Sequence, residues 1–243
     1  MGLPVELPRV RGGWRCILAD NPWSFNDKGS RIAPDAMTLR VRRGRGRSRL
    51  YRTMPLVWIA NLPVREIAAS SAHLYLWCPS ALLAEGLVVM AAWGFTLKTT
   101  IVWDKVTKHG KSAFGAGHYF RGAHELVLFG VRGRCPALNR SQRTRFEAPV
   151  GDEHSSKPAR LYELAELVSP GPRLELFARE ERPGWTGWGD EYPKGGSTDD
   201  ERRTGCRLHL SPAQGRPDPP VRRAARERPR ARRAGGCLVS AQP

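Results

Sequence analysis

The sequence contains no apolar run that approaches the roughly 18 to 20 residues needed to span a bilayer. Its N-terminus also lacks the basic segment followed by an apolar stretch that is typical of a secretion signal. Both absences argue against a membrane protein, and we expect a cytoplasmic one. With 243 residues, of which 40% are hydrophobic, the chain is long enough for one substantial α/β domain with its own core.

The five cysteines are too scattered for a disulfide framework or a zinc site. None belongs to a CxxC pair, and no His or Cys pair has zinc-finger or HExxH spacing. Cys16 and Cys78 lie in apolar runs that are typical of buried strands. We therefore expect free, mostly buried thiols and no metal centre. A dinucleotide site is not expected either, because Gly115-Ala116-Gly117 lacks the full glycine fingerprint.

Acidic residues are scarce in two segments, and this scarcity explains most of the net charge of +17. Residues 36–52 carry seven arginines and no acid, whereas residues 194–243 carry twelve basic and five acidic residues. The rest of the chain is nearly balanced. For both segments two interpretations stay open: solvated, arginine-rich disorder, or binding to the phosphates of nucleic acid.

Short apolar runs alternate with segments of helical spacing along the first four fifths of the chain. The runs predict buried strands at residues 14–19, 73–78, 97–103, 125–131 and 173–178. The helical segments are residues 80–93 and 158–168. This alternation predicts an α/β fold with a mainly parallel, doubly wound sheet.

The first helical segment has its own start and stop signals. Ser80 is expected to cap its N-terminus, and Gly94 is expected to end it. Its apolar residues at helical spacing are Leu83, Leu87 and Met90.

Changes in composition indicate the domain boundaries. We expect residues 1–13 to form an N-terminal arm and residues 14–193 to form the globular domain, which includes an arginine-rich loop at 36–50. After Tyr192, glycine, serine, proline and arginine replace most apolar residues, so residues 194–243 are predicted to be a disordered basic tail.

The tetrapeptide Asp20-Asn21-Pro22-Trp23 directly follows the first predicted strand, at the sheet edge where ligands bind in such folds. Its residue types suit a flat base that carries an amino group. The carboxylate of Asp20 and the backbone carbonyl of Asn21 can each accept one N–H of that amine. Pro22 stiffens the turn, and Trp23 offers a face for stacking. Taken alone, the same residues are also common turn chemistry.

Several other segments accompany the tetrapeptide in a fixed order. They are Tyr51-Arg52-Thr53-Met54, Leu74-Tyr75-Leu76-Trp77, Ala92-Trp93-Gly94-Phe95, Trp103-Asp104-Lys105, Ala123-His124-Glu125, His154-Ser155-Ser156-Lys157-Pro158, Leu174-Glu175-Leu176-Phe177-Ala178-Arg179 and Gly184-Trp185 through Trp188-Gly189. In these segments and their order, the chain resembles the adenine N6-methyltransferases typified by the catalytic subunit of the mRNA adenine methyltransferase. The resemblance is stronger to the bacterial and phage members, and it spans about residues 14–191.

The resemblance implies a Rossmann-like methyltransferase sheet in a permuted order, with the catalytic motif before the cofactor segment. It implies S-adenosylmethionine as cofactor and adenine in nucleic acid as substrate, with DNA favoured over RNA. Asp20, Pro22 and Trp23 match the catalytic D-P-P-W of the family, and Tyr51 matches a tyrosine that lies over the adenine pocket. Asn21 departs from the family, which has a proline at this position.

Two further residues match the substrate pocket of the family. Trp77 is similar to an aromatic residue that lines this pocket, although ordinary core packing would explain it equally well. Glu125 is similar to a pocket glutamate, and its alternative interpretation is a charge at the entrance of a strand. Gly122 departs from the asparagine that is common in relatives.

The resemblance implies cofactor contacts for six residues: Asp20, Lys157, Glu175, Arg179, Asp190 and Glu191. Lys157 is similar to the lysine that the family places against the methionine moiety. Glu175 and Arg179 match residues that bind the ribose and carboxylate region, although a structural salt bridge between the two is the alternative. The last two fall where the family has a polar pair near the adenosine.

Two other functions stay open. A member that keeps the fold and binds nucleic acid, but has lost activity, is compatible with the departure at Asn21. A cytosine N4-methyltransferase uses equivalent amine chemistry, but its motif more often begins with serine, so Asp20 favours adenine.

Overall fold

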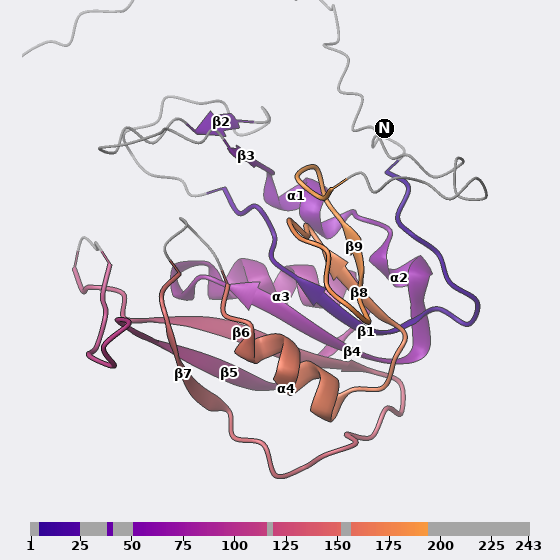
Figure 1. Cartoon of the computed structure of the whole chain (residues 1–243). Coiled ribbons are helices and arrows are strands. Elements are labelled where there is room, and N and C mark those ends of the chain that lie inside the picture. Colours follow the sequence, from indigo (N-terminus) through magenta and orange to yellow (C-terminus); the bar gives the residue numbers. More distant parts are fainter. Residues whose placement is uncertain (1–4, 25–37, 41–50, 116–118, 152–156, 194–243) are drawn as a thin grey trace, which may run out of the picture. The chain divides into compact units, whose positions relative to one another are not determined.

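The computed structural model describes residues 5–24, 38–40, 51–115, 119–151 and 157–193 (Figure 1). The predicted tail at 194–243 lies outside these residues, as does all of the predicted arginine-rich loop except residues 38–40. The described helices are α1 (Leu56–Ala60), α2 (Val64–Ile67), the short 3-10 helix η1 (Ser80–Leu82), α3 (Leu83–Ala92) and α4 (Arg160–Val168).

Most of the described strands form one seven-stranded sheet in the order β7-β5-β6-β4-β1-β8-β9. The sheet contains β1 (Trp14–Ala19), β4 (Ala68–Cys78), β5 (Thr96–Val106), β6 (His124–Arg132), β7 (Arg145–Pro149), β8 (Arg173–Leu176) and β9 (Thr186–Trp188). Strand β6 runs antiparallel to both of its neighbours, and the other six strands share one direction. A separate antiparallel pair is formed by β2 (Thr38–Arg40) and β3 (Tyr51–Thr53).

Two hydrophobic clusters lie on opposite faces of the sheet. Alternate residues of β1 point to different clusters, with Ile17 in the first and Leu18 in the second. Helices α1, α2 and α3 contribute to the first cluster, and α4 contributes Leu161 and Leu164 to the second. The described domain therefore has a sheet with helices on both faces, which confirms the predicted doubly wound, mainly parallel α/β fold. The permuted order of motifs stays a prediction.

Strand β1 is central because its residues are apolar on both faces. Cys16, Ile17, Leu18 and Ala19 are all fully buried, as expected for an internal strand of a parallel sheet. A tight turn precedes it at Gly13, where φ is 81° and a Cβ would lie 2.6 Å from the backbone nitrogen of Ala69. Only glycine fits both constraints.

All five predicted strands are confirmed, and the predicted helices correspond to η1 with α3 and to α4. The predicted cap at Ser80 is wrong, since its hydroxyl lies 3.2 Å from Nε2 of His124 and makes no cap hydrogen bond. Leu83 and Leu87 are also exposed, because the buried side of α3 is formed by Gly86, Val89 and Met90.

The cysteine prediction is confirmed where it can be compared with the structure. Cys16, Cys78 and Cys135 are free and buried. Burial raises the pKa of the Cys16 thiol to about 12 and that of Cys78 to about 11. The other two cysteines lie outside the described residues. Within the described part of the chain, no helix is long and apolar enough to cross a membrane.

Candidate active site

The predicted catalytic tetrapeptide begins directly after β1, at the point where the sheet changes its winding. From β1 the chain crosses one face through α1 and α2 to β4, whereas β8, on the other side of β1, is reached from α4 on the opposite face. In open α/β sheets, ligands bind in the crevice outside the carboxyl ends of the strands at such a switch point. Asp20 lies in this position.

The N–H of Asp20 donates to the carbonyl of Leu176 at the end of β8 at 3.4 Å, and three further hydrogen bonds hold the rest of the tetrapeptide in place. The N–H of Trp23 donates to the carbonyl of Asn21 at 2.8 Å, and the N–H of Met54 donates to the carbonyl of Pro22 at 2.8 Å. The indole N–H of Trp23 donates to the carbonyl of Trp77 at 3.0 Å. The turn is thus fixed both to the segment after β3 and to the end of β4.

The side chain of Asn21 is enclosed but has no partner. Asn21 is 3% exposed, and neither its Oδ1 nor its Nδ2 makes a hydrogen bond in the described part of the chain. An unpaired, buried polar group costs about 1 to 3 kcal/mol. This residue is therefore a local weakness within the tetrapeptide.

Four charged side chains of alternating sign meet at the carboxyl edge of the sheet. Nζ of Lys157 lies 3.0 Å from Oδ1 of Asp20 and 3.6 Å from Oε2 of Glu125. The other oxygen of Glu125 accepts a hydrogen bond from Nζ of Lys105 at 2.6 Å. The structure thus brings together three of the predicted site residues and adds Lys105.

Burial and charge act in opposite directions on Lys157. Burial alone would lower the pKa of its ammonium, but the carboxylates of Asp20 and Glu125 outweigh this effect and raise the pKa above its usual value. Lys157 is therefore cationic at neutral pH. Its Nζ also lies 5.4 Å from the ring centroid of Trp77, in a cation–π contact.

Both predicted pocket tryptophans are part of the core. Trp23 is 7% exposed and belongs to the first cluster, while Trp77 is 1% exposed and belongs to the second. Core packing of Trp77 is thus established, and an edge-to-face contact with Trp103 at 5.8 Å adds to it. In the part of the chain that the structure describes, the indole N–H of Trp77 has no hydrogen-bond partner. The predicted pocket roles of both residues stay predictions.

A second charged cluster, distinct from the hydrophobic clusters of the core, lies around Glu175 on β8, the strand beside β1. The hydroxyl of Tyr162 donates to Oε1 of Glu175 at 2.6 Å, and the guanidinium of Arg182 lies 3.8 Å from the centroid of the Tyr162 ring. Burial raises the pKa of the Glu175 carboxyl, although Tyr162 and Arg182 partly oppose this. The negative charge of Asp20 also contributes to this increase.

The chain has an uncommon conformation immediately after β8. Phe177 has a φ of 64°, in the left-handed region that aromatic residues rarely adopt. Gly189, after β9, lies so close that a Cβ there would be 2.6 Å from the carbonyl oxygen of Ala178. This close approach brings the segment after β9 beside the end of β8, and Arg179 lies 3.7 Å from Glu191.

The remaining predicted site residues are accounted for as follows. Arg179 pairs with Glu191 and not with Glu175, so the alternative of a structural salt bridge between Glu175 and Arg179 is not found among the described residues. Asp190 lies in the same segment as Glu191. Tyr51 pairs with Arg40 in the β2–β3 ladder, and its side chain lies outside the described part.

Three contributors to these clusters were not predicted from the sequence, namely Lys105, Tyr162 and Arg182. Lys105 stands two residues after Trp103, which is paired with Glu125 across β5 and β6, and this register is known only from the structure. Tyr162 packs in the second hydrophobic cluster with the apolar residues of α4, and nothing in the sequence marks it as the partner of Glu175. In the described ranges, no group of three or more His, Cys, Asp or Glu residues could hold a metal ion.

A comparison with known families decides the relationship of the chain. The model of the MT-A70 family matches residues 14–191. The chain belongs to the MT-A70 family. The match covers every strand of the large sheet and both charged clusters.

Individual relatives are similar to the chain over different lengths. The type II methyltransferase M.MunI of Mycoplasma sp is 28% identical over 199 residues, which are 77% of this chain and 81% of the relative. The N(6)-adenine-specific methyltransferase METTL4 of Mus musculus is 27% identical over 165 residues, 61% of this chain and 34% of the relative. The N(6)-adenosine-methyltransferase subunit METTL3 of Danio rerio is 26% identical over 140 residues, which are 54% of this chain and 23% of the relative. The chain thus spans about a third or less of the two animal proteins.

Proposed function

We propose that this chain transfers the methyl group of S-adenosylmethionine to the N6 amine of adenine in nucleic acid, and that DNA is its preferred polymer. The proposal depends mainly on one observation: in a member of the MT-A70 family, Asp20, Lys157 and Glu175 are gathered around the carboxyl ends of β1 and β8. The names of METTL4 and METTL3 specify N6 of adenine or adenosine, which supports the chosen atom. The resemblance to bacterial and phage members favours DNA.

The residues of the site fit S-adenosylmethionine. Its methionine end carries a carboxylate and an ammonium, which complement the ammonium of Lys157 and the carboxylate of Asp20, 3.0 Å apart. The carboxylate of Glu175 can accept hydrogen bonds from the two ribose hydroxyls. The unpaired N–H of Trp77, under Lys157, is a further donor in this region. When bound, the cofactor supplies an activated methyl group on a sulfonium.

The chain's own contribution to the reaction is to bind and orient the amine. The lone pair of an adenine amine is delocalised into the ring, so the amine must be held by its hydrogens while the lone pair turns toward the methyl group. Asp20 accepts one N–H. The carbonyl of Asn21 already accepts the N–H of Trp23, but a carbonyl oxygen has a second lone pair for the other N–H. Positioning and electrostatics thus provide the rate enhancement.

A base in duplex DNA must leave the stack to reach this turn, at a cost of a few kcal/mol. The cost is smaller for a single strand. We therefore expect faster transfer to unpaired than to paired adenine at equal concentration.

The test combines labelled S-adenosylmethionine with DNA or RNA and identifies the product by nucleoside analysis. Wild-type protein should produce N6-methyladenine, in DNA more than in RNA. Asp20→Ala should lower the rate by about 10²- to 10³-fold, which is typical of losing one group that stabilises developing charge. Far-UV circular dichroism and the midpoint of urea unfolding show whether the variant is folded.

Three results would refute the proposal. Full transfer by Asp20→Ala would remove the carboxylate from the mechanism. Methyl groups on N4 of cytosine would show that the chain is a cytosine N4-methyltransferase. Binding of cofactor and polymer without incorporation into either polymer would identify a non-catalytic member of the family.

A further inference from the structure

The segment that follows β6 is a third basic region, in addition to the two predicted from composition. Residues 132–145 contain five arginines and no acidic residue. Unlike the predicted tail, the whole segment belongs to the described residues. We call residues 132–145 the basic segment.

The basic segment is fixed to the domain at several points. The N–H of Leu138 donates to the carbonyl of Val168 at the end of α4, at 2.8 Å. Nε2 of His73 on β4 donates to the carbonyl of Cys135 at 2.9 Å. Its arginines are therefore carried by a backbone with a defined position.

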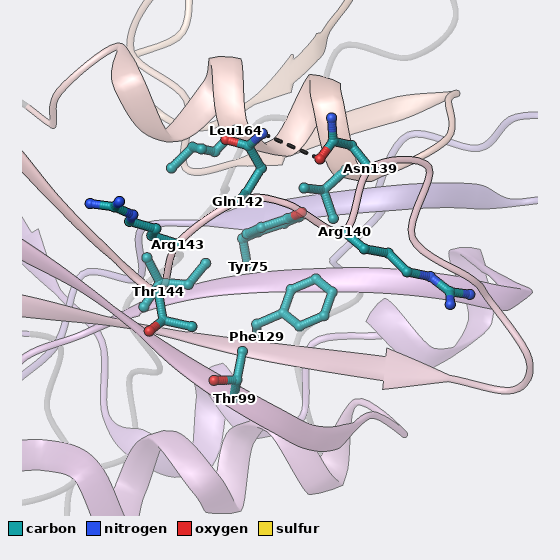
Figure 2. Close-up of a pocket in the computed structure, with 11 residues that line it drawn as sticks. Tyr75, Thr99, Phe129, Asn139, Arg140, Gln142, Arg143, Thr144 and Leu164 are labelled. Atoms are coloured by element: carbon teal, nitrogen blue, oxygen red, sulfur yellow. Dashed lines mark hydrogen bonds between the residues drawn. The ribbon is translucent and has the colours of Figure 1, made fainter.

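A side-chain turn fixes the middle of the segment. Oδ1 of Asn139 accepts hydrogen bonds from the N–H and the hydroxyl of Ser141, at 2.9 Å and 2.8 Å. It also accepts one from the amide of Gln142 at 3.3 Å, as Figure 2 shows. This turn separates Arg140 from Arg143, and their guanidinium groups extend in different directions (Figure 2).

Two adjoining hollows lie between the basic segment and α4, with volumes of about 110 Å³ and about 250 Å³. They share Gln142, Arg143 and Leu164, so together they form one groove. The aromatic rings of Tyr75 and Phe129 lie at its floor, on β4 and β6 (Figure 2). We call this feature the α4 groove.

The positive charges along the α4 groove are only partly compensated. Arg145 is paired with Asp104, and Arg160 is paired with Glu163 at 2.7 Å. For Arg140 and Arg143, no ion pair or hydrogen bond of the side chain is found within the part of the chain that the structure describes. Two exposed, uncompensated guanidinium groups on one groove favour an anionic occupant.

One end of the α4 groove adjoins the candidate active site. Arg160, which lines the groove, is the first residue of α4 and stands three residues after Lys157. Asp104, the partner of Arg145, directly precedes Lys105 of the charged cluster. A polymer whose target base is at Asp20 would continue along this groove.

We propose that the α4 groove binds the nucleic-acid strand beside the target base, with Arg140 and Arg143 contacting its phosphates. The inference rests on the proposed function, because it is the nucleic-acid substrate that supplies the polyanion. Guanidinium groups match phosphate oxygens in geometry, and the groove leads to the reacting residues, where the substrate strand must pass. An acidic protein would satisfy the charge but not this continuity.

The test compares the wild-type full chain with a double variant that carries both Arg140→Gln and Arg143→Gln. Affinity for a labelled single-stranded oligodeoxynucleotide is measured by fluorescence anisotropy over a series of salt concentrations. Each lost phosphate contact reduces the slope of log K against log salt by about 0.7 for single strands, so a reduction of about 1.4 is expected. The control is the double variant with Arg9→Gln and Arg11→Gln, two exposed arginines that precede β1, of which Arg9 pairs with Glu66 at 3.1 Å. Its slope should equal that of the wild type.

An unchanged slope in the groove variant would overturn the proposal. So would a change in its oligomeric state with unchanged DNA binding, because the groove would then be a protein interface. The two proposals fail separately. If the wild type methylates DNA and the groove variant keeps its slope, only the groove assignment is wrong. If the groove variant loses slope and the wild type methylates no polymer, only the catalytic assignment is wrong.

Discussion

Lys157 holds its ammonium 3.0 Å from the carboxylate of Asp20, and this contact joins the segment before α4 to the end of β1. Only 11% of the Lys157 side chain and 18% of the Asp20 side chain are exposed. At this depth water screens the two charges poorly, so each strongly influences the other. The pair therefore links these two segments and also places two opposite charges in the candidate active site.

Replacing Lys157 by methionine should lower the free energy of unfolding by about 1 to 3 kcal/mol, because Asp20 and Glu125 lose the cation between them. Urea unfolding measures the change. Lys157→Arg keeps the charge and should lose less. Equal midpoints for wild type and Lys157→Met would mean that desolvation of the ions cancels their attraction.

Tyr162→Phe removes the hydroxyl that donates to Glu175. A hydrogen bond to a charged group contributes about 1.5 to 3 kcal/mol, and we expect a loss of this size in urea unfolding. Calorimetric titration should also show weaker binding of S-adenosylmethionine, because Glu175 is no longer held in place. The control is Tyr119→Phe, whose side chain is 95% exposed and should affect neither measurement. Unchanged cofactor affinity in Tyr162→Phe would exclude a positioning role.

Glu175→Gln tests the cost of the buried charge through its dependence on pH. The pKa of Glu175 is raised in the folded protein, so the folded state holds this proton more tightly than the unfolded state. Its contribution to stability is complete below about pH 4.5, the ordinary value, and is lost as the pH rises through the raised pKa. The variant has no such group. It should therefore gain stability relative to wild type as the pH rises, which thermal unfolding at a series of pH values would show.

The same Glu175→Gln protein should bind the cofactor about tenfold more weakly, since a neutral acceptor forms a weaker hydrogen bond than a carboxylate. A constant difference in melting temperature between variant and wild type at every pH would contradict the raised pKa. Unchanged cofactor affinity would contradict the proposed ribose contact.

The central part of the fold could be predicted because its strands are continuous apolar runs that end at turn residues. The predicted strand at 14–19 coincides with β1, and its end placed Asp20 correctly at the sheet edge. Strands β7 and β9 were missed for the opposite reason. Each lies at an edge of the sheet, has three to five residues and contains polar or glycine positions. Neither therefore contains the apolar run from which a buried strand is predicted.

Helices α1 and α2 were missed because five and four residues are too short to show a helical period. The partners within the site needed information that a linear pattern does not contain. Lys105 meets Glu125 only through the antiparallel register of β5 and β6, and Tyr162 meets Glu175 only because α4 packs on the face below β8. The residue types of the site were therefore predictable from the motifs, but their pairing was not.

Asn21→Pro restores the proline of the family motif and removes two unpaired polar atoms from a buried position. Among the described residues, no hydrogen bond from the backbone N–H of Asn21 is found, so a proline at this position sacrifices no donor there. Proline also reduces the freedom of the unfolded chain, by about 0.4 to 1 kcal/mol where the backbone is compatible. We expect a gain of about 1 to 2 kcal/mol in the free energy of unfolding, measured in urea.

Asn21→Ala separates the two effects, because it removes the amide without stiffening the turn. It should be more stable than wild type but less stable than Asn21→Pro. Methyl transfer should be retained in both variants, because the proposed contact to the amine uses the backbone carbonyl of residue 21 and not its side chain. If both variants lose transfer while they bind the cofactor normally, the side-chain amide itself contacts the substrate, and the departure from the family motif is a feature of recognition.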